Sequence, residues 1–215
     1  MGIGKWIAAG AGIAAVGGAI AYAQYRDIEK PAYEVVLSDG DFEVRQYAPM
    51  IVAEVTHSGK RRDAQGASFR RLAAYIFGDD RPNGGEEIAM TAPVMTERVE
   101  ENEKIAMTAP VLLEETGTDT WRTRFVMPSK YTMETLPTPP SDITLSEIPG
   151  RRMAAIRFSG NASDADLIVM ERRLMDWIET QDLSPVSDPQ YAFYDAPMIP
   201  GPLRRNEILV ELAAE

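Results

Sequence analysis

Histidine and cysteine, which often act as nucleophiles and metal ligands, are almost absent from this sequence. The 215-residue chain has one histidine, His57, and no cysteine. The lack of cysteine excludes disulfides, thiolate-bound zinc, iron–sulfur clusters and a cysteine nucleophile. A single histidine excludes a metal site built from several imidazoles, and any Ser-His-Asp arrangement would have to use His57.

The charged residues carry no recognisable catalytic motif. Carboxylates are plentiful, yet the sequence has no phosphate-binding loop and no nucleophile motif, so we do not expect an enzyme. Aspartate and glutamate outnumber lysine and arginine by 33 to 22, which gives a formal net charge of −11 without a basic stripe. Such a surface repels phosphate backbones, and binding to nucleic acid is therefore not expected.

One seven-residue string, Ile-Ala-Met-Thr-Ala-Pro-Val, occurs twice, at residues 88–94 and 105–111. Identity over seven residues is too improbable for chance and indicates a tandem duplication of 17 residues. Alternation predicts an extended strand in each copy, and each proline places the strand end at a sheet edge or bulge, with residues 95–104 as a hairpin tip. Met90 and Met107 then either fill the core or turn one thioether toward a ligand.

The N-terminal segment, residues 6–23, has no charged side chain. Its length is near the lower limit for a helix that spans the ~30 Å hydrocarbon core of a bilayer. It also ends in Ala21-Tyr22-Ala23, the small-x-small form of a signal-peptidase site. The segment is therefore a retained membrane anchor, a cleaved signal peptide or a buried or peripheral helix of a soluble protein. The first two alternatives predict a membrane-anchored or exported protein on the extracytoplasmic side.

Hydrophobic periodicity predicts a domain over residues 33–215, joined by a short linker at 29–32 to the N-terminal segment. Strands are predicted at 33–37, 42–47, 51–57, 121–127, 143–148, 153–158, 191–194 and 207–212. A first helix is predicted over 63–77, with Phe69, Leu72 and Ile76 on its core face and Gly78 as its C-cap. A second helix is predicted from an N-cap at Ser163 to about residue 181.

The domain contains a coarser internal symmetry. The order strand, turn, strand, Ser-Gly, helix describes residues 42–78 and again residues 143–181, and VAEVTHSG at 52–59 overlies MAAIRFSG at 153–160. These two segments predict an α+β fold in which two related halves build one mostly antiparallel, barrel-like sheet with two helices against it. The N-terminal apolar segment adds a further helix.

Several strings carry a family resemblance: KIAMTAPV at 104–111, FVMPSKYTMETLPTP at 125–139 and YDAPMIPGPLRRNEILV at 194–210. With YEVVLSDGDFEVRQYAPMIVAEV at 33–55, they span nearly the whole domain in order and resemble the SOUL haem-binding family. The resemblance implies a barrel-like α+β domain that holds haem or another tetrapyrrole noncovalently. Similar architecture occurs in bacterial effector-binding domains, which take up diverse hydrophobic small molecules.

The sequence departs from the family pattern at two places. Some members have a histidine, considered as an iron ligand, before the tyrosine of an R-H-Y segment, whereas this chain has Gln46 between Arg45 and Tyr47. Many members have the M-T-x-P string once, and here either copy could hold the family position. The iron ligand of those members therefore does not transfer to this chain.

The candidate ligand-binding residues are those that could hold a tetrapyrrole. His57 is the only nitrogen donor of the usual type for iron, and it is either an axial ligand or a hydrogen-bonded residue at the end of its strand. Arg204 and Arg205 either enter the last strand with solvated or paired charges, or one of them pairs with a ligand carboxylate, as Arg70 or Arg71 could. Weaker candidates for the iron are Met90, Met107, Met127, Tyr47 and Tyr75.

Two alternatives to haem binding remain open at this point. One is an envelope scaffold or interaction domain without a small-molecule ligand, and the other is a site for a different hydrophobic small molecule. A pocket lined by a pair of carboxylates would instead favour an enzyme.

Overall fold

The computed structural model describes residues 28–81, 86–99 and 119–214. The N-terminal apolar segment, Met107 and the second copy of the repeated string lie outside the described residues. Within the described ranges, no helix is long and apolar enough to cross a membrane.

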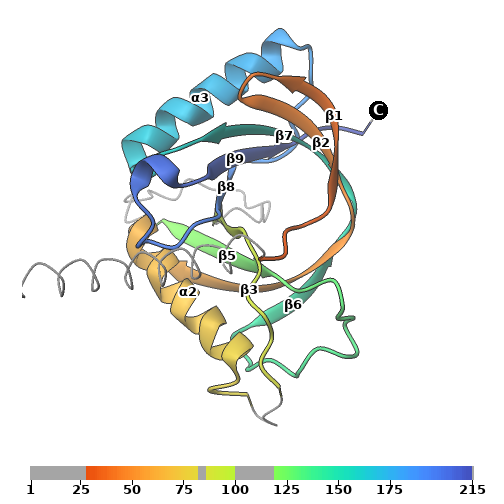
Figure 1. Ribbon diagram of the computed structural model, residues 1–215, viewed down its shortest axis with the longest axis vertical. Coiled ribbons are helices and arrows are strands. Elements are labelled where there is room, and N and C mark those ends of the chain that lie inside the picture. The colour runs from red at the N-terminus through yellow and green to blue at the C-terminus, as the bar shows by residue number, and fades with distance from the viewer. Residues whose placement is uncertain (1–27, 82–85, 100–118, 215) are drawn as a thin grey trace, which may run out of the picture.

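Nine strands form one sheet that curves into a half-barrel (Figure 1). Their order across the sheet is β1-β2-β7-β9-β8-β4-β5-β3-β6, and every neighbouring pair is antiparallel. The strands are β1 (Tyr33–Asp39), β2 (Phe42–Tyr47), β3 (Met50–Ser58), β4 (Val94–Val99), β5 (Thr120–Val126), β6 (Thr144–Ile148), β7 (Arg151–Phe158), β8 (Gln190–Phe193) and β9 (Asn206–Glu211). The predicted antiparallel sheet is confirmed as a half-barrel.

Two helices, α2 (Arg61–Phe77) and α3 (Asp164–Thr180), cover one face of the sheet (Figure 1). Helix α2 packs on β3 and β5, and α3 packs on β7 and β9. Ser163 caps α3 in a reciprocal capping box with Asp166, and Gly78 ends α2 in the left-handed conformation that favours glycine. A short 3-10 helix, η1 (Gly201–Leu203), lies between β8 and β9.

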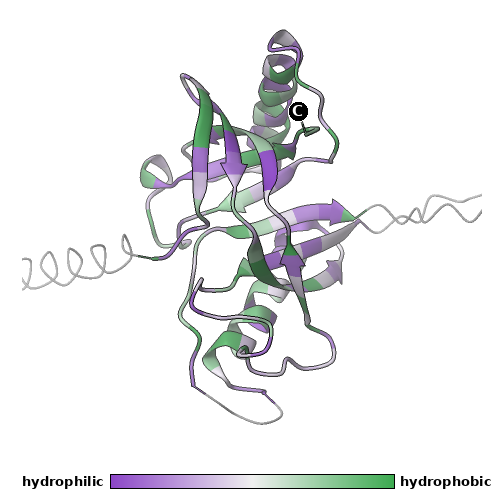
Figure 2. Cartoon of the chain, turned by 90° about the vertical axis from the view of Figure 1, so that its right-hand side faces the viewer, coloured by the Kyte–Doolittle hydropathy of each residue, from purple (hydrophilic) through white to green (hydrophobic). Residues whose placement is uncertain are grey.

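Strand alternation divides the core between the two faces of the sheet. On β9, Ile208 and Val210 pack beneath α3, whereas Leu209 faces the opposite, inner side of the half-barrel. Ala53 and Val55 of β3 pack under α2 in the same way. Figure 2 shows the corresponding hydrophobic and hydrophilic bands along the strands.

Apart from β1, the strand order is the same when it is read from either edge of the sheet. In this comparison β2, β3, β4 and β5 correspond to β6, β7, β8 and β9. Gly59 after β3 and Gly160 after β7 have nearly equal positive φ angles, 120° and 117°. The indole Nε1 of Trp121 donates to the Gly59 carbonyl, and the amide of Asn206 donates to the Gly160 carbonyl. These matched contacts agree with the two related halves that the sequence predicts.

The first copy of the repeated string is not the strand that alternation predicts. Residues 88–93 lie outside the sheet strands, apart from one isolated bridge between Thr91 and Glu29. The prediction of a hairpin tip from residue 95 is also wrong, because Met95 to Val99 belong to β4. The Ala92-Pro93 peptide bond is cis, and β4 begins directly after it. The proline therefore lies before a strand and not at its end.

The segment before β1 is bound to the domain by backbone hydrogen bonds. The amide of Ala92 donates to the carbonyl of Glu29, and the amide of Ala48 donates to the carbonyl of Ala32. The Glu29 carboxylate also accepts a hydrogen bond from the Ser129 amide at 2.7 Å. Residues 28–32 are thus part of the domain surface.

Candidate functional site

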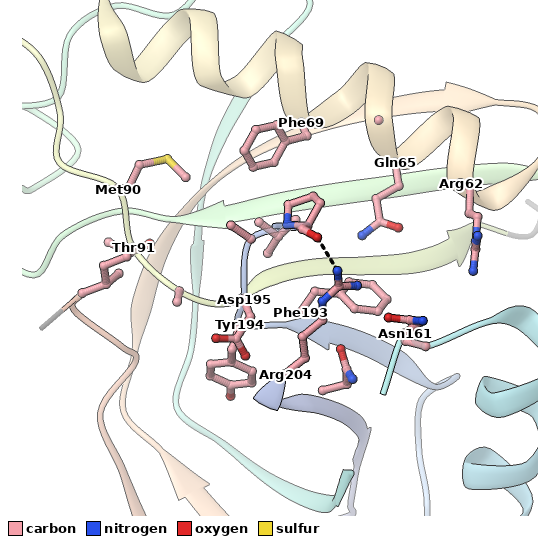
Figure 3. Close-up of a pocket in the computed structure, with 18 of the residues that line it drawn as sticks. Arg62, Gln65, Phe69, Met90, Thr91, Asn161, Phe193, Tyr194, Asp195 and Arg204 are labelled. Atoms are coloured by element: carbon pink, nitrogen blue, oxygen red, sulfur yellow. Dashed lines mark hydrogen bonds between the residues drawn. The ribbon is translucent and has the colours of Figure 1, made fainter. Parts of the chain in front are cut away.

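A cavity of about 420 Å³ lies between α2 and the segment that joins β8 to β9. We call it the α2 cavity. Figure 3 shows Phe69 and Gln65 reaching toward it from α2, with Arg204 and Asn161 on the opposite side. Its volume is within the range of small-molecule sites in proteins.

Much of the wall of the α2 cavity is apolar. Phe69 of α2 and Phe193 of β8 contribute aromatic rings, and Met90 and Ile28 contribute aliphatic and thioether surface. The Phe69 ring lies edge-on to Phe125 with 5.4 Å between ring centroids, yet the residue remains 39% exposed. An aromatic side chain held by packing on one side and open on the other is suited to contact a flat hydrophobic ligand.

Three arginines, Arg62, Arg70 and Arg204, lie on the α2 cavity and form no ion pair among the described residues. The guanidinium of Arg204 donates to the carbonyls of Pro197 and Ile199, so it also shapes the segment that closes the cavity (Figure 3). Of the wall residues that the structure describes, Asp195 is the one carboxylate, and it accepts a hydrogen bond from the Arg205 amide. The cavity therefore presents positive charge in an acidic protein, and it favours ligands with carboxylates.

Arg61 joins the two helices at one end of the α2 cavity. Its side chain is 7% exposed, and its guanidinium pairs with Asp164 at the start of α3 at 2.6 Å. It also donates to the Ala162 carbonyl and to Gln65. These contacts fix the distance between the helices and the width of the cavity.

A buried ion network supports the wall of the α2 cavity from the inner side of the sheet. Glu207 is fully buried and accepts hydrogen bonds from Arg45 at 2.7 and 3.0 Å, from Arg205 at 2.7 and 2.9 Å and from the Tyr194 hydroxyl at 2.8 Å. Burial raises the pKa of Glu207, but the hydrogen bond and charge of Arg45 and the charge of Arg205 outweigh it, so the pKa lies below its usual value. Tyr194 carries this network to the cavity, because it is also a wall residue.

The structure brings some of the sequence-predicted ligand residues together. Met90, Arg204 and Arg70 all lie on the α2 cavity. His57 lies beneath α2, where its Nδ1 is 2.9 Å from the buried hydroxyl of Ser68, and it does not line this cavity. Met107 lies outside the described residues.

The other candidates have structural partners elsewhere. Tyr75 is fully buried and donates to the Pro137 carbonyl at 2.6 Å, and its pKa is raised by burial. Arg205 belongs to the Glu207 network, and Arg71 pairs with Asp142 and Asp80 at the far end of α2. Tyr47 accepts a hydrogen bond from buried Arg45, and Met127 is 4% exposed in the core beneath α2.

Sequence reasoning missed several residues of the α2 cavity. Phe69 is assigned to the helix core by periodicity, but it contacts Phe125 on one side, stays 39% exposed and lines the cavity. Phe193 and Asn161 carry no local signal, since the chain fold alone places them opposite α2. The basic run on α2 offered the one usable signal, because Arg62 and Arg70 have no carboxylate three or four residues away to pair with.

Comparison with known families decides the classification. The model of the SOUL heme-binding protein family matches residues 28–102 and 97–211. The chain belongs to the SOUL family. This match confirms the resemblance seen in the sequence strings, and it covers the residues of the α2 cavity. No curated protein matches the chain.

Solved structures show that the fold of this SOUL-family chain is shared more widely. A hydrolase from Listeria innocua has 11% identity and a TM-score of 0.51, covering 83% of this chain and 94% of that chain. The EcmrR C-terminal domain has 12% identity and a TM-score of 0.55, covering 85% and 99%. EcmrR in a DNA complex has 12% identity and a TM-score of 0.57, covering 99% and 69%. At these identities the likeness shows the fold alone.

The α2 cavity fits the organic part of the group that the SOUL family implies. Its aromatic and apolar residues suit a flat macrocycle, and its arginines suit carboxylate substituents. Among the described residues, the one sulfur on its wall is that of Met90, and no imidazole lines it. Residues present at the cavity therefore favour noncovalent retention of the macrocycle over strong coordination of iron.

Proposed function

We propose that this protein binds haem or a related tetrapyrrole in the α2 cavity, for buffering or transfer of the ligand. The observation that carries the proposal is that one cavity of a SOUL-family chain combines aromatic walls with three arginines that form no ion pair among the described residues. Phe69 and Phe193 would contact the ring, and Arg62, Arg70 and Arg204 would pair with its carboxylates. The iron, when present, supplies an electrophilic centre that a thioether could ligate.

Titration of haem into the purified full-length chain tests this proposal. We expect one saturable Soret change at a one-to-one ratio of haem to protein. Arg62→Gln with Arg70→Gln should weaken binding about tenfold, because the carboxylates of the ligand lose two arginine partners. Arg98→Gln is the control, since Arg98 pairs with Asp119 away from this cavity. A titration without saturation would exclude haem and leave a scaffold or another hydrophobic ligand.

Two single substitutions separate the candidate iron ligands. We expect Met90→Leu to move the Soret band of the haem complex, because Met90 lies on the cavity. His57→Ala should leave the band unchanged, because His57 is hydrogen-bonded to Ser68 and does not line the cavity. Absorption spectra of the oxidised and reduced complexes would measure both. A band that moves with His57→Ala alone would assign the iron to His57 and place the ligand elsewhere.

We also propose that residues 6–23 attach the domain to a membrane, because they carry no charge and lie close in sequence to Ile28, a residue of the cavity wall. Four residues separate Ala23 from Ile28 and span at most about 18 Å when extended. The cavity would then open close to the bilayer. Fractionation of cells should place the full chain with membranes and a chain from residue 28 in the soluble fraction; a soluble full chain would contradict attachment.

A further inference from the structure

The α2 cavity has a counterpart in the other half of the fold. A cavity of about 560 Å³ lies beside the N-terminal half of α3, against β4, β5 and β8. We call it the α3 cavity. Arg61 lines both cavities and separates them.

The two helices contribute equivalent positions to the two cavities. The buried residues Leu72, Tyr75 and Ile76 of α2 have the same spacing as Leu174, Trp177 and Ile178 of α3. In that alignment, four residues on the wall of the α2 cavity fall on four residues on the wall of the α3 cavity. These pairs are Arg62 with Asp164, Gln65 with Leu167, Gly66 with Ile168 and Phe69 with Glu171.

The strands give the same correspondence independently. Trp121 and Asn206 are equivalent, because each donates to the glycine carbonyl that follows β3 or β7. Trp121 pairs across the sheet with Arg98, and Asn206 pairs with Phe193. Each of these pairs lines the cavity of its own half. The α3 cavity is therefore the second copy of one duplicated site.

The charge of the second copy is reversed. Asp164 replaces Arg62, and Asp119 stands two residues before Trp121 where Arg204 stands two residues before Asn206. Asp164 pairs with Arg61 at 2.6 Å, and Asp119 pairs with Arg98 at 2.5 Å.

The remaining charged groups on the α3 cavity give it a negative balance. They are Glu171 and Asp188 against the exposed Lys60, and none of the three has an ion-pair partner among the described residues. The rings of Trp121 and Tyr191, with centroids 6.3 Å apart, add aromatic surface.

We propose that the α3 cavity is a second ligand site, which takes a hydrophobic organic cation. Carboxylates attract the charge, and an aromatic wall with Leu167 and Ile168 contacts the apolar body. The net charge of −11 strengthens this selectivity, since the whole protein attracts cations. The site is separate from the haem-binding proposal and stands whether or not the α2 cavity binds haem.

Fluorescence titration with acridine orange, a flat aromatic cation, tests the second site. We expect one-to-one saturable binding to the full chain, with quenching of Trp121 emission that Trp121→Phe removes. Glu171→Gln with Asp188→Asn should weaken binding about tenfold or more, because both unpaired carboxylates lose their charge. Glutamine at position 171 can still accept the hydrogen bond from the Tyr191 hydroxyl, which measures 3.0 Å.

Matched controls make the outcome decisive. Arg62→Gln, at the equivalent position of the other half, should leave acridine orange affinity within twofold. Anilinonaphthalene sulfonate, an anion of similar size, should bind independently of Glu171 and Asp188. The proposal fails if acridine orange does not saturate, if the double variant keeps its affinity while its circular dichroism is native, or if Arg62→Gln weakens binding equally. Glu171→Gln alone serves if the double variant does not fold.

Discussion

Replacing Glu207 with alanine should lower the free energy of unfolding by about 3–5 kcal/mol, because it removes the buried carboxylate that Arg45 and Arg205 share and leaves Arg45 only its pair with the partly exposed Glu43. Arg45 is 2% exposed and its guanidinium forms two hydrogen bonds to the Glu207 carboxylate. Small domains have only about 5–15 kcal/mol of stability in total. Urea denaturation followed by circular dichroism would measure this loss, and it is the largest that we expect from any single substitution in the described fold.

The control for this prediction is Asp119→Asn, which breaks an ion pair of similar length whose partners are 55% and 45% exposed. That change should cost less than about 1 kcal/mol, since water screens exposed pairs. Equal losses of unfolding free energy in the two variants would show that the buried Glu207 network stabilises the fold no more than an exposed ion pair does.

The same network predicts how stability depends on pH. Because the pKa of Glu207 is lowered in the folded protein, its contribution is complete above the pKa of an unfolded glutamate, about 4.3. It is lost as the pH falls through the still lower folded value. Glu207→Gln should therefore flatten the decline of stability in this acid range, relative to the unaltered chain.

Replacing Gly66 with leucine should weaken ligand binding at the α2 cavity about tenfold or more while keeping the fold. Gly66 lies within α2 on the cavity wall, and a Cβ atom there would meet only the end of the Arg70 side chain at 3.6 Å. Removing a glycine from a helix interior raises stability by about 0.5–1 kcal/mol, so the larger side chain occupies the cavity without unfolding the protein. Haem titration and thermal melting would measure the two effects.

Gly66→Ala separates these effects, because a methyl group gives the helix most of the gain and takes little of the cavity. Its affinity should stay within about fourfold of the unaltered chain, given that one buried methyl group has an effect of about 0.8 kcal/mol. Full affinity in Gly66→Leu would show that the ligand binds elsewhere. The α3 cavity already has Ile168 at the equivalent position.

The sequence predicted the sheet, both helices and the duplication because those features rest on local periodicity and on turn residues such as Gly59 and Gly160. It failed at residues 88–93, where the bridge between Thr91 and Glu29 and the hydrogen bond from the Ala92 amide to the Glu29 carbonyl hold the chain outside the sheet strands. Such contacts link segments that are distant in the chain, and no local pattern encodes them.

The site was predictable only in part for the same reason. Met90 and Arg204 belong to strings that mark the family, and both reach the α2 cavity. Phe193 and Asn161 come from the other half of the fold, so their place beside α2 depends on the packing of one half against the other. His57 was a candidate iron ligand because it is the only histidine of the chain. Its contact with Ser68 depends on how α2 lies over β3, which the sequence does not show.

The interleaved strand order has a consequence for synthesis on the ribosome. Phe42 of β2 pairs with Ile156 of β7. One edge of β2 therefore has no partner strand until more than a hundred further residues have been synthesised. At about 5–20 residues per second, that edge stays open for roughly 5–20 s. An open strand edge invites pairing with other chains. We therefore expect the yield of folded protein in the cell to depend on translation speed and on chaperones that cover nascent strands.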